Sequence, residues 1–331
     1  MTRPANAQEI LSLARNFMEC RVLLTGAELD IFTHLAGPVS SRDLAEKQGW
    51  HERPLTVVLD ALAAMGLLIK EDGHYRTDSG LLPLLSAHSS RSVLPMIKHA
   101  ATIWKNWSHL TRIVAETGGV EKAPGRFEGR EDQEAFIGAM HVVGRQYAPA
   151  IVQAVQPGPA RRLLDVGGAS GTYTIAFLEA SPQMSATIFD LPDVVAIGRV
   201  RVAEAGLADR VTFVSGNFYT DPLPSGHDLA LLSAIIHQNS PEQNLALYKK
   251  VRAALVPRGR LVIRDHVMKN DKTAPPSGAL FAVNMLVGTP GGGTYSYEEI
   301  RSGLAQAGFE DIRLIQEEDR MMGLVEAYRP R

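Results

Sequence analysis

The stretch Leu163-Leu164-Asp165-Val166-Gly167-Gly168-Ala169-Ser170-Gly171 decides the fold of this chain. It reads as a short apolar strand that meets an acidic residue and runs through a glycine-rich turn into a helix. Glycines at such a turn let a ligand approach the backbone, and they leave amide N–H donors free at the start of the helix. The stretch therefore predicts a ligand-binding strand–turn–helix unit. A tight turn without any ligand is the plainer alternative.

Further short apolar strands alternate with helical stretches after this unit, which indicates a mostly parallel, doubly wound α/β sheet. Ser240 and Ser296 begin two of the helices with capping-box sequences. Ile312–Gln316 and Gly323–Tyr328 follow one another with no helix between them, so we expect an antiparallel edge hairpin. The expected central strands are Arg162–Val166, Ala186–Asp190, Val211–Val214, Leu229–Ser233 and Arg260–Arg264.

The chain changes character at the breaker cluster Gln156-Pro157-Gly158-Pro159. The pattern before the cluster is almost wholly helical, with apolar residues at helical spacing from Leu11 to Leu35 and from Leu55 to Met65. A two-residue turn at Asp72-Gly73 then joins two short strands, and two helices followed by a hairpin are typical of a winged helix. We expect a winged-helix-like domain over 1–100, linking helices over 101–156 and the sheet domain over 157–331.

The composition is that of an ordinary soluble protein and excludes several classes. The 331 residues are 45% hydrophobic and carry a formal charge of −2, so nothing attracts the chain to polyanions in general. The single cysteine, Cys20, rules out an intrachain disulfide and a cysteine-based zinc site. The polar start and the absence of an apolar run of about 20 residues predict a cytoplasmic protein with no membrane partner.

Polar residues stand at or just after the carboxyl ends of the five central strands, where open sheets of this kind bind ligands. They are Asp165, Asp190, Asn217, His237 and Asp265. A carboxylate after the second strand accepts hydrogen bonds from ribose hydroxyls, a role that suits NAD and S-adenosylmethionine alike. A dinucleotide fingerprint has the spacing Gly-x-Gly-x-x-Gly, whereas this turn has Gly-Gly-x-x-Gly. A helix N-cap is the structural alternative for Asp190.

In this order and spacing, the motifs resemble those of the S-adenosylmethionine-dependent O-methyltransferase family of plant phenolic and bacterial secondary-metabolite enzymes. The residues that carry the resemblance are Leu163–Gly171, Asp190-Leu191-Pro192, Gly216-Asn217-Phe218, His237 and Pro290-Gly291-Gly292, together with the region Trp104 to Leu110. The resemblance covers nearly the whole chain. It implies a Rossmann-like methyltransferase sheet, a homodimer formed through the N-terminal domain, and no nucleic acid partner.

The resemblance also assigns roles to residues. The expected cofactor-binding residues are Asp165, Gly167, Gly168, Gly171, Asp190, Leu191, Asn217, Phe218 and Ser233. The expected catalytic pair is His237 with Asp265, and no metal is needed. Phe136, Met140, Phe281 and Met285 stand at the family's substrate-pocket positions, although methionine and aromatic residues at helical spacing are equally typical of a core.

Several positions depart from the family pattern. His237 is followed by Gln238-Asn239, where the family usually has Asp-Trp. Asp265 replaces a longer glutamate, and Thr294 stands where a second glutamate often occurs. Asn217 and Ala169 replace the commoner aspartate and glycine. These changes do not prevent cofactor binding. The carboxylate that is missing at Thr294 concerns the reaction itself.

A phenolic acceptor has to lose its proton, and His237 is the candidate base for that step. A phenol with a pKa near ~10 is ionised to roughly one part in a thousand at neutral pH, and only the phenolate is a good nucleophile. A histidine base with a pKa near neutrality contributes ~10²–10⁴ in rate. A carboxylate such as Asp265 orients the imidazole through its other nitrogen. His237 as a surface or capping histidine is the alternative interpretation.

Two other functions stay open at this point. A family member acting on carbon or nitrogen, or with non-methylating chemistry, fits the altered residues after His237. A winged-helix, ligand-responsive DNA-binding regulator fits the N-terminal pattern. The region Ser40–Pro54, however, has an almost neutral mixture of charges, which is poor for binding phosphates.

Overall fold

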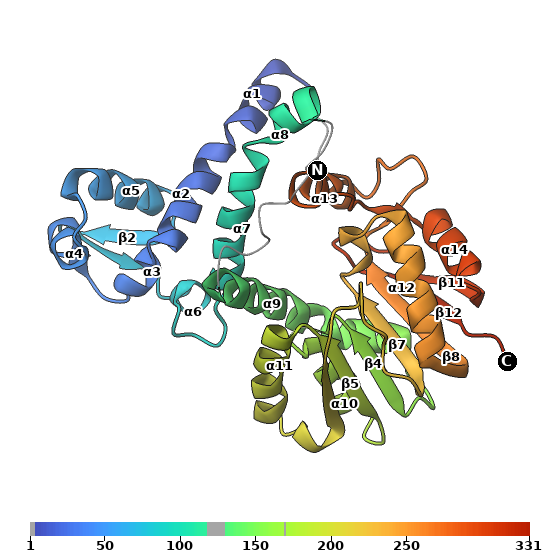
Figure 1. The fold of residues 1–331 in the computed structure, drawn as a ribbon. Coiled ribbons are helices and arrows are strands. Elements are labelled where there is room, and N and C mark those ends of the chain that lie inside the picture. Colours follow the sequence, from blue (N-terminus) through green and yellow to red (C-terminus); the bar gives the residue numbers. More distant parts are fainter. Residues whose placement is uncertain (1–3, 118–129, 169) are drawn as a thin grey trace. The chain divides into compact units, whose positions relative to one another are not determined.

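The computed structural model describes residues 4–117, 130–168 and 170–331, and side chains between 117 and 135 are outside the description. The chain divides into two compact units (Figure 1). The first comprises Met1–Lys105 with Glu131–Val142, and the second comprises Asn106–Arg130 with Val143–Arg331. Helix α9 (Arg130–Val155) contributes to both units, so this division differs from the three consecutive segments expected from the sequence.

The second unit is built on a seven-stranded sheet in the order β11-β12-β8-β7-β4-β5-β6. Every expected strand forms within a few residues of its predicted bounds, and the α/β fold class is confirmed. The order reverses between β4 and β7, which creates the switch point where such sheets bind ligands. The strands are β4 (Arg162–Val166), β5 (Ser185–Asp190), β6 (Val211–Ser215), β7 (His227–Ser233), β8 (Leu255–Asp265), β11 (Glu310–Gln316) and β12 (Gly323–Tyr328).

Strand β12 is the exception to the parallel arrangement of this sheet. It pairs antiparallel with both β8 and β11, as the predicted hairpin requires. The remaining pairings, β8–β7–β4–β5–β6, are all parallel. The carboxyl ends of these five strands therefore lie along one edge of the sheet.

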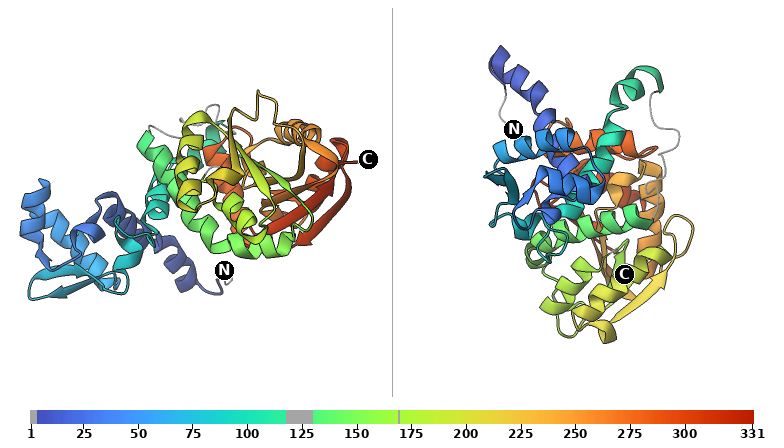
Figure 2. Two further views of the ribbon diagram at one scale, coloured as in Figure 1. Left: turned by 90° about the horizontal axis from the view of Figure 1, so that it is seen from below. Right: turned by 90° about the vertical axis from the view of Figure 1, so that its left-hand side faces the viewer.

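Helices cover both faces of the sheet (Figures 1 and 2). Phe177 and Leu178 of α10 (Thr172–Ala180) share a buried cluster with Ile151 of α9 on one face. Leu247 of α12 (Pro241–Ala254) and Leu304 of α14 (Tyr297–Gln306) belong to the buried cluster on the other. We call these the α10 face and the α12 face. Helix α11 (Pro192–Glu204) packs beside β5 and β6.

The helix starts predicted from capping sequences are confirmed. The Ser240 and Ser296 hydroxyls each accept a hydrogen bond from the backbone N–H three residues later, and the side chains of Gln243 and Glu299 return the bond. Both helices follow strands at the ligand edge, so the boxes fix where the chain leaves that edge. The remaining elements of this unit include α8 (Leu110–Arg112), α13 (Pro276–Gly288), β9 (Val267–Met268) and β10 (Tyr295–Ser296).

The first unit contains the predicted winged-helix arrangement. Helices α4 (Ser41–Gln48) and α5 (Glu52–Ala64) precede the hairpin of β2 (Leu68–Glu71) and β3 (His74–Thr77), to which β1 (Val39–Ser40) adds a third strand. Phe32, Leu59 and Tyr75 are fully buried in its core. Helices α6 (Leu82–Leu85) and α7 (Leu94–Trp107) follow.

The apolar segment before the winged helix forms three helices, as its helical spacing predicts. These are α1 (Ala7–Arg15), α2 (Phe17–Glu28) and α3 (Ile31–His34), and Asp30 between the last two adopts a left-handed backbone with φ of 51°. Helix α1 has no buried residue. Large apolar side chains on α1 and α2 are about half exposed, namely Ile10, Leu11, Leu13, Phe17 and Met18. Within the described residues, no helix is long and apolar enough to cross a membrane.

Candidate active site

His237 reaches the ligand edge through a sharp change of direction after β7. Ala234 follows the last residue of the strand with a φ of 58°, a backbone conformation that side chains other than glycine rarely adopt. Its N–H donates to the carbonyl of Arg264 on β8 over 2.8 Å. A single 3-10 turn, Ile236–Gln238, then carries the histidine. Backbone strain of this kind persists only where the surroundings hold it, and it often marks a functional site.

The structure pairs His237 with Asp265, as the sequence predicts. The Nδ1 atom of His237 lies 2.9 Å from both Oδ1 and Oδ2 of Asp265. Both residues are buried, with exposed fractions of 5% and 1%. A carboxylate only accepts hydrogen bonds, so the Nδ1 atom carries the proton and the Nε2 atom of the neutral ring keeps its lone pair. This tautomer is the one that a general base requires.

Asp265 is held as a carboxylate despite its burial. Burial by itself opposes ionisation, but the facing His237 ring and the hydrogen bonds from His237 and from the His266 N–H together hold the pKa of Asp265 below its usual value. The His266 bond to Oδ1 measures 2.8 Å. The carboxylate is therefore both charged and fixed in orientation, as required of a group that orients a histidine.

The glycines that follow Pro290 pack against the backbone of His237. The N–H of Gly293 donates to the His237 carbonyl over 2.8 Å. A Cβ atom on Gly292 would lie only 2.5 Å from the same carbonyl oxygen, so this close approach requires glycine. The ring of Phe281 on α13 meets the His237 ring edge to face at 4.8 Å. Backbone and aromatic contacts therefore both fix the imidazole.

The glycine turn after β4 is as tight as the sequence suggests. Gly167 has a φ of 71°, and a Cβ atom there would lie 2.4 Å from Ile235. A Cβ atom on Gly168 would lie 2.8 Å from the carboxyl carbon of Asp165. Gly171 caps α10 in the left-handed conformation. These three glycines bring the backbone of the turn close to the strand ends.

Asp165 lies beneath this turn on the α10 face. Its Oδ2 atom accepts a hydrogen bond of 2.7 Å from Thr174, and the residue is 3% exposed. Burial raises the pKa of Asp165 to about 6, the Thr174 bond opposes the rise, and the charge of Asp190 adds to it. Asp165 therefore supports the turn from below rather than facing solvent.

Asp190 ends β5 and is not the N-cap of the following helix. Leu191 occupies the N-cap position of α11 without a side-chain cap, and its N–H donates to Oδ1 of Asp190 over 2.7 Å. Asp190 is half-buried, and Leu191 is 44% exposed. The structural alternative considered for Asp190 is therefore not what the chain adopts.

Asn217 and Phe218 follow β6 in a compact turn. The Asn217 side-chain oxygen accepts from the Tyr219 N–H over 2.9 Å, so it stabilises its own loop. Phe218 is half-buried against the core of the α12 face and within 3.8 Å of where a Cβ atom on Gly167 would stand. The Phe218 ring thus borders the glycine turn, whereas the Asn217 oxygen is already engaged.

The departures from the family pattern after His237 form a buried polar network. Asn239 is fully buried, and its amide donates to Asn244 over 2.9 Å. Its side-chain oxygen accepts from the Tyr219 hydroxyl, and its carbonyl accepts from the Tyr295 hydroxyl. Asn239 therefore connects the loop of Phe218 with the turn of His237.

Thr294 supplies no carboxylate to the histidine. It is buried, and its carbonyl accepts from the Lys272 ammonium over 2.9 Å. Asp265 is thus the acidic partner that the structure gives to His237. Asp265 contacts the histidine through both oxygens, so the orienting role stays occupied.

The four expected pocket residues fall in different units. Phe136 and Met140 on α9 are half-buried in the first unit, where Phe136 contacts the His99 ring at 5.0 Å. Phe281 and Met285 on α13 belong to the second unit, and Phe281 lies against His237. The pocket assignment remains a prediction for all four residues.

Sequence reasoning missed the side chains that surround Ser233. The Arg264 guanidinium donates to the Ser233 hydroxyl over 3.2 Å and lies over the Tyr173 ring at 5.0 Å. The signal was the arginine at 264, which lies between the apolar run Leu261–Ile263 and Asp265 on the same strand. A second missed contact is that of Trp107, whose indole N–H donates to Asn284 over 3.0 Å. No group of three or more potential metal ligands gathers within the described ranges.

The sheet order, the glycine turn and the paired His237 and Asp265 define a Rossmann-like transferase with its site at the switch point. Comparison with known proteins refines this class. The family model of the O-methyltransferase domain matches residues 107–310, and that of the O-methyltransferase dimerisation domain matches residues 11–80. The chain belongs to the O-methyltransferase family, as the sequence motifs predicted.

Relatives match over nearly their whole length. The chain is 32% identical to 3-hydroxy-5-methyl-1-naphthoate 3-O-methyltransferase of Streptomyces sahachiroi, over 93% of this chain and 90% of that protein. It is 32% identical to the tetracenomycin polyketide synthesis 8-O-methyl transferase of Streptomyces glaucescens, over 92% of each. The solved structure of human N-acetylserotonin methyltransferase with S-adenosylmethionine has a TM-score of 0.84 and 23% identity, covering 100% of both chains, and supports the fold alone.

The protein is therefore an S-adenosylmethionine-dependent O-methyltransferase that transfers a methyl group to a hydroxyl. S-adenosylmethionine is its cofactor, and its N-terminal unit carries a dimerisation domain.

Proposed function

We propose that the protein methylates a hydroxyl of a small aromatic acceptor, with His237 as the general base. The observation that carries the proposal is the bond between the His237 Nδ1 atom and a buried, ionised Asp265, at 2.9 Å. This bond leaves Nε2 to take a proton, and Asp265 stabilises the imidazolium as it forms. The proton passes from the acceptor hydroxyl to Nε2 as the oxygen attacks.

Bound S-adenosylmethionine supplies an electrophilic methyl group on a sulfonium. The residues present fit that cofactor, because the glycine turn admits no side chain and a carboxylate and an aromatic ring stand beside it. In this proposal the turn from Gly167 to Gly171 provides close backbone approach. Asp190 accepts from the ribose hydroxyls, Leu191 and Phe218 border the base, and Ser233 lies by the methionine end. Asp165 holds the turn, and Asn217 orders the loop of Phe218.

An aromatic acceptor is supported by the surroundings of His237 and by the relatives. Phe281 lies against the imidazole, and Met285 is one helical turn further along α13. Two Streptomyces relatives are named for a hydroxynaphthoate and for a tetracenomycin polyketide. Flat apolar walls of this kind select ring systems over aliphatic alcohols.

The test is a panel of acceptors with labelled S-adenosylmethionine. Single-ring phenols, hydroxynaphthoates, hydroxyquinones and an aliphatic alcohol are compared, and the site of the label is read by mass spectrometry and NMR. We expect O-methylation of the fused aromatic hydroxyls and none of the aliphatic alcohol. Label on carbon or nitrogen would contradict a hydroxyl as the acceptor group.

A homodimer formed through the first unit is the second part of the proposal. Five large apolar side chains on α1 and α2 are about half exposed, an arrangement that a second copy would bury. The dimerisation-domain match covers residues 11–80, which include four of these five. Light scattering should give about twice the chain mass of 36.0 kDa. A monomer at micromolar concentration would contradict the proposal, and Leu13→Asp with Phe17→Asp should produce one.

A further inference from the structure

Arg264 is a buried cation without an acidic partner. Its exposed fraction is 3%, and none of the ion pairs formed by the described side chains includes it. Its Nη1 atom donates to the Ser233 hydroxyl, and its Nε atom is buried with no hydrogen-bond partner. Guanidinium groups stay charged in proteins, and a buried charge costs several kcal/mol unless it is paired. The fold therefore holds an uncompensated positive charge at the end of β8.

The neighbours of Arg264 share its lack of partners. Tyr173 at the start of α10 lies under the guanidinium, with 5.0 Å between the Cζ atom and the ring centre. The Tyr173 hydroxyl is also buried; among the described residues it forms no hydrogen bond of normal geometry, and the Ser233 hydroxyl is the polar group that faces it. Asp165, on the same face, does not neutralise the arginine, because its carboxylate bonds with Thr174 and forms no ion pair with Arg264. The Arg264 Nε atom and the Tyr173 hydroxyl are thus two buried donors of one cluster that lack a well-formed hydrogen bond.

The position of this cluster points to the ligand edge rather than to the core. Ser233 and Arg264 are paired in register at the carboxyl ends of β7 and β8, beside β4 and its glycine turn. Successive side chains of a strand point to opposite faces, so Arg264 faces α10 while Asp265 faces His237. An acceptor whose hydroxyl lies at His237 is therefore on the face of β8 opposite to Arg264.

We propose that Arg264, with Ser233 and Tyr173, forms an anion subsite for the α-carboxylate of S-adenosylmethionine. A carboxylate is the chemistry that satisfies a guanidinium fork and a phenolic donor together. An aromatic acid acceptor offers the same group, but the position of Arg264 over Tyr173, two residues beyond Gly171, favours the cofactor. The inference deepens the proposed cofactor site and is independent of the role of His237.

The test compares two ligands that share the adenosine part. S-adenosylhomocysteine carries the carboxylate, and 5′-methylthioadenosine lacks the whole amino-acid end. By calorimetry, Arg264→Met should weaken S-adenosylhomocysteine binding about ten- to hundredfold, the range for a hydrogen bond to a charged group. Binding of 5′-methylthioadenosine should not change. Arg264→Lys should fall between, because it keeps the charge and loses the fork.

A matched control separates this role from a structural one. Arg260 lies on the same strand and face but pairs with Glu326 over 2.6 Å. Arg260→Met should lower the melting temperature and leave the ratio of the two affinities unchanged. Arg264→Met should not lower the melting temperature of the ligand-free protein, since replacing an unpaired buried charge by an apolar side chain removes its desolvation cost. The stabilisation by S-adenosylhomocysteine should shrink.

Three outcomes would overturn the proposal. An equal loss of both ligands would make Arg264 structural. An unchanged affinity ratio in Arg264→Met would remove the carboxylate contact. A loss confined to a hydroxynaphthoate, with none for the matching naphthol or for S-adenosylhomocysteine, would assign the arginine to an acid acceptor. Failure of His237 as a base would affect none of these binding measurements.

Discussion

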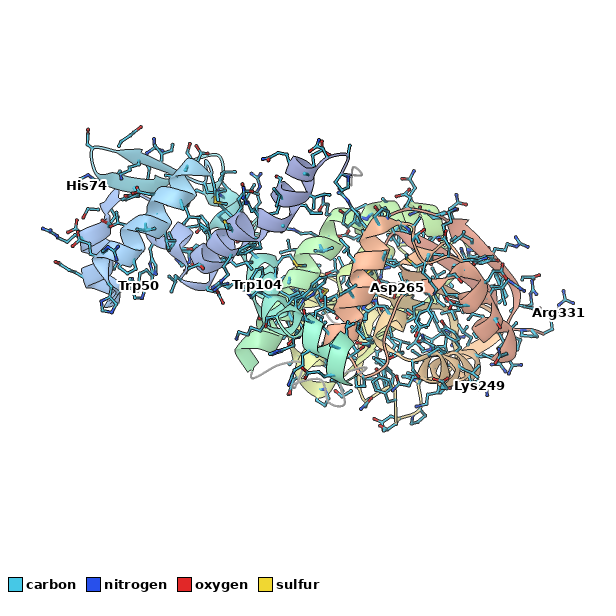
Figure 3. The ribbon with its side chains drawn as sticks, turned by 90° about the horizontal axis from the view of Figure 1, so that it is seen from above. Trp50, His74, Trp104, Lys249, Asp265 and Arg331 are labelled. Atoms are coloured by element: carbon cyan, nitrogen blue, oxygen red, sulfur yellow. The ribbon has the colours of Figure 1, made fainter. Side chains whose placement is uncertain are left out.

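Arg264 and Asp265 are consecutive buried charges on β8 that face opposite sides of the sheet. Asp265 finds His237 and the His266 N–H within the protein, and its charge is stabilised without any ligand. Among the described side chains, Arg264 bonds with the hydroxyl of Ser233 and lies over the Tyr173 ring, but pairs with no carboxylate. The pair of Asp265 and His237 is therefore complete and can take part in proton transfer. Arg264 has no counter-charge of this kind, so it is suited to a ligand that brings a negative charge. Figure 3 labels Asp265 among the densely packed side chains of the second unit.

From this comparison we predict that substitutions on the two faces of the sheet change different quantities, turnover on one face and cofactor affinity on the other. Changes at His237 and Asp265 should alter turnover at constant cofactor affinity. Changes around the glycine turn should alter cofactor affinity first. Single substitutions can test whether turnover and cofactor affinity change separately.

His237→Ala should lower turnover by ~10²–10⁴ with little change in the dissociation constant of S-adenosylmethionine, because the lost interaction belongs to the transition state. In the variant the rate should follow ionisation of the acceptor hydroxyl. Near-normal turnover by the variant on a phenol of pKa near ~10 would rule out general-base catalysis by this residue.

Asp265→Asn should cost less, about ten- to hundredfold in turnover, the worth of a hydrogen bond between charged groups. The amide oxygen can occupy the Oδ1 position, where it accepts from both the His266 N–H and the His237 Nδ1 atom. The amide nitrogen then replaces Oδ2 at 2.9 Å from the same Nδ1 atom, where two donors face each other, so the variant loses the stabilisation of the imidazolium and holds the Nδ1-protonated tautomer less firmly. Steady-state kinetics with calorimetry measure both quantities. A loss larger than that of His237→Ala would contradict an orienting role.

Asp190→Ala should weaken cofactor binding by ~1–3 kcal/mol through lost hydrogen bonds to a charged group. Turnover at saturating cofactor should change much less. Calorimetry with S-adenosylhomocysteine measures the affinity, and Asp193→Ala on the next turn of the chain is the control. Unchanged binding in Asp190→Ala would remove this residue from the site.

Asp165→Asn should change how stability depends on pH. The folded pKa of Asp165 is raised to about 6, above its unfolded value, so the folded state binds the extra proton between about pH 4 and 6. Ionising the buried group therefore costs about 2–3 kcal/mol of unfolding free energy as pH rises through that window. The asparagine variant lacks this cost and still accepts from Thr174. Urea unfolding at pH 4 and pH 7 should show the variant gaining stability relative to wild type at the higher pH, and a constant difference would contradict the raised pKa.

The sequence by itself determined the sheet and the position of the site. The glycine turn after Asp165, the strand–helix alternation and the capping boxes at Ser240 and Ser296 depend on local chemistry, and local chemistry can be read along the chain. The pairing of His237 with Asp265 was predictable too, because carboxyl ends of parallel strands meet at one edge. The helical pattern from Leu11 to Leu35 did not show where one helix ends and the next begins, since a left-handed residue such as Asp30 leaves no clear signal in the pattern.

Only the tertiary structure decided which buried polar groups find a hydrogen-bond partner or a counter-charge. No spacing indicates that Asn239 joins Tyr219 and Asn244, or that Thr294 leaves Asp265 as the acidic partner of His237. Nor does the sequence show that Arg264 lacks a counter-charge while Asp265 has one. Hydrogen-bond satisfaction depends on side chains that arrive from strands and helices far apart in the chain. Burial then decides what each unpaired group costs, and both follow from packing in three dimensions.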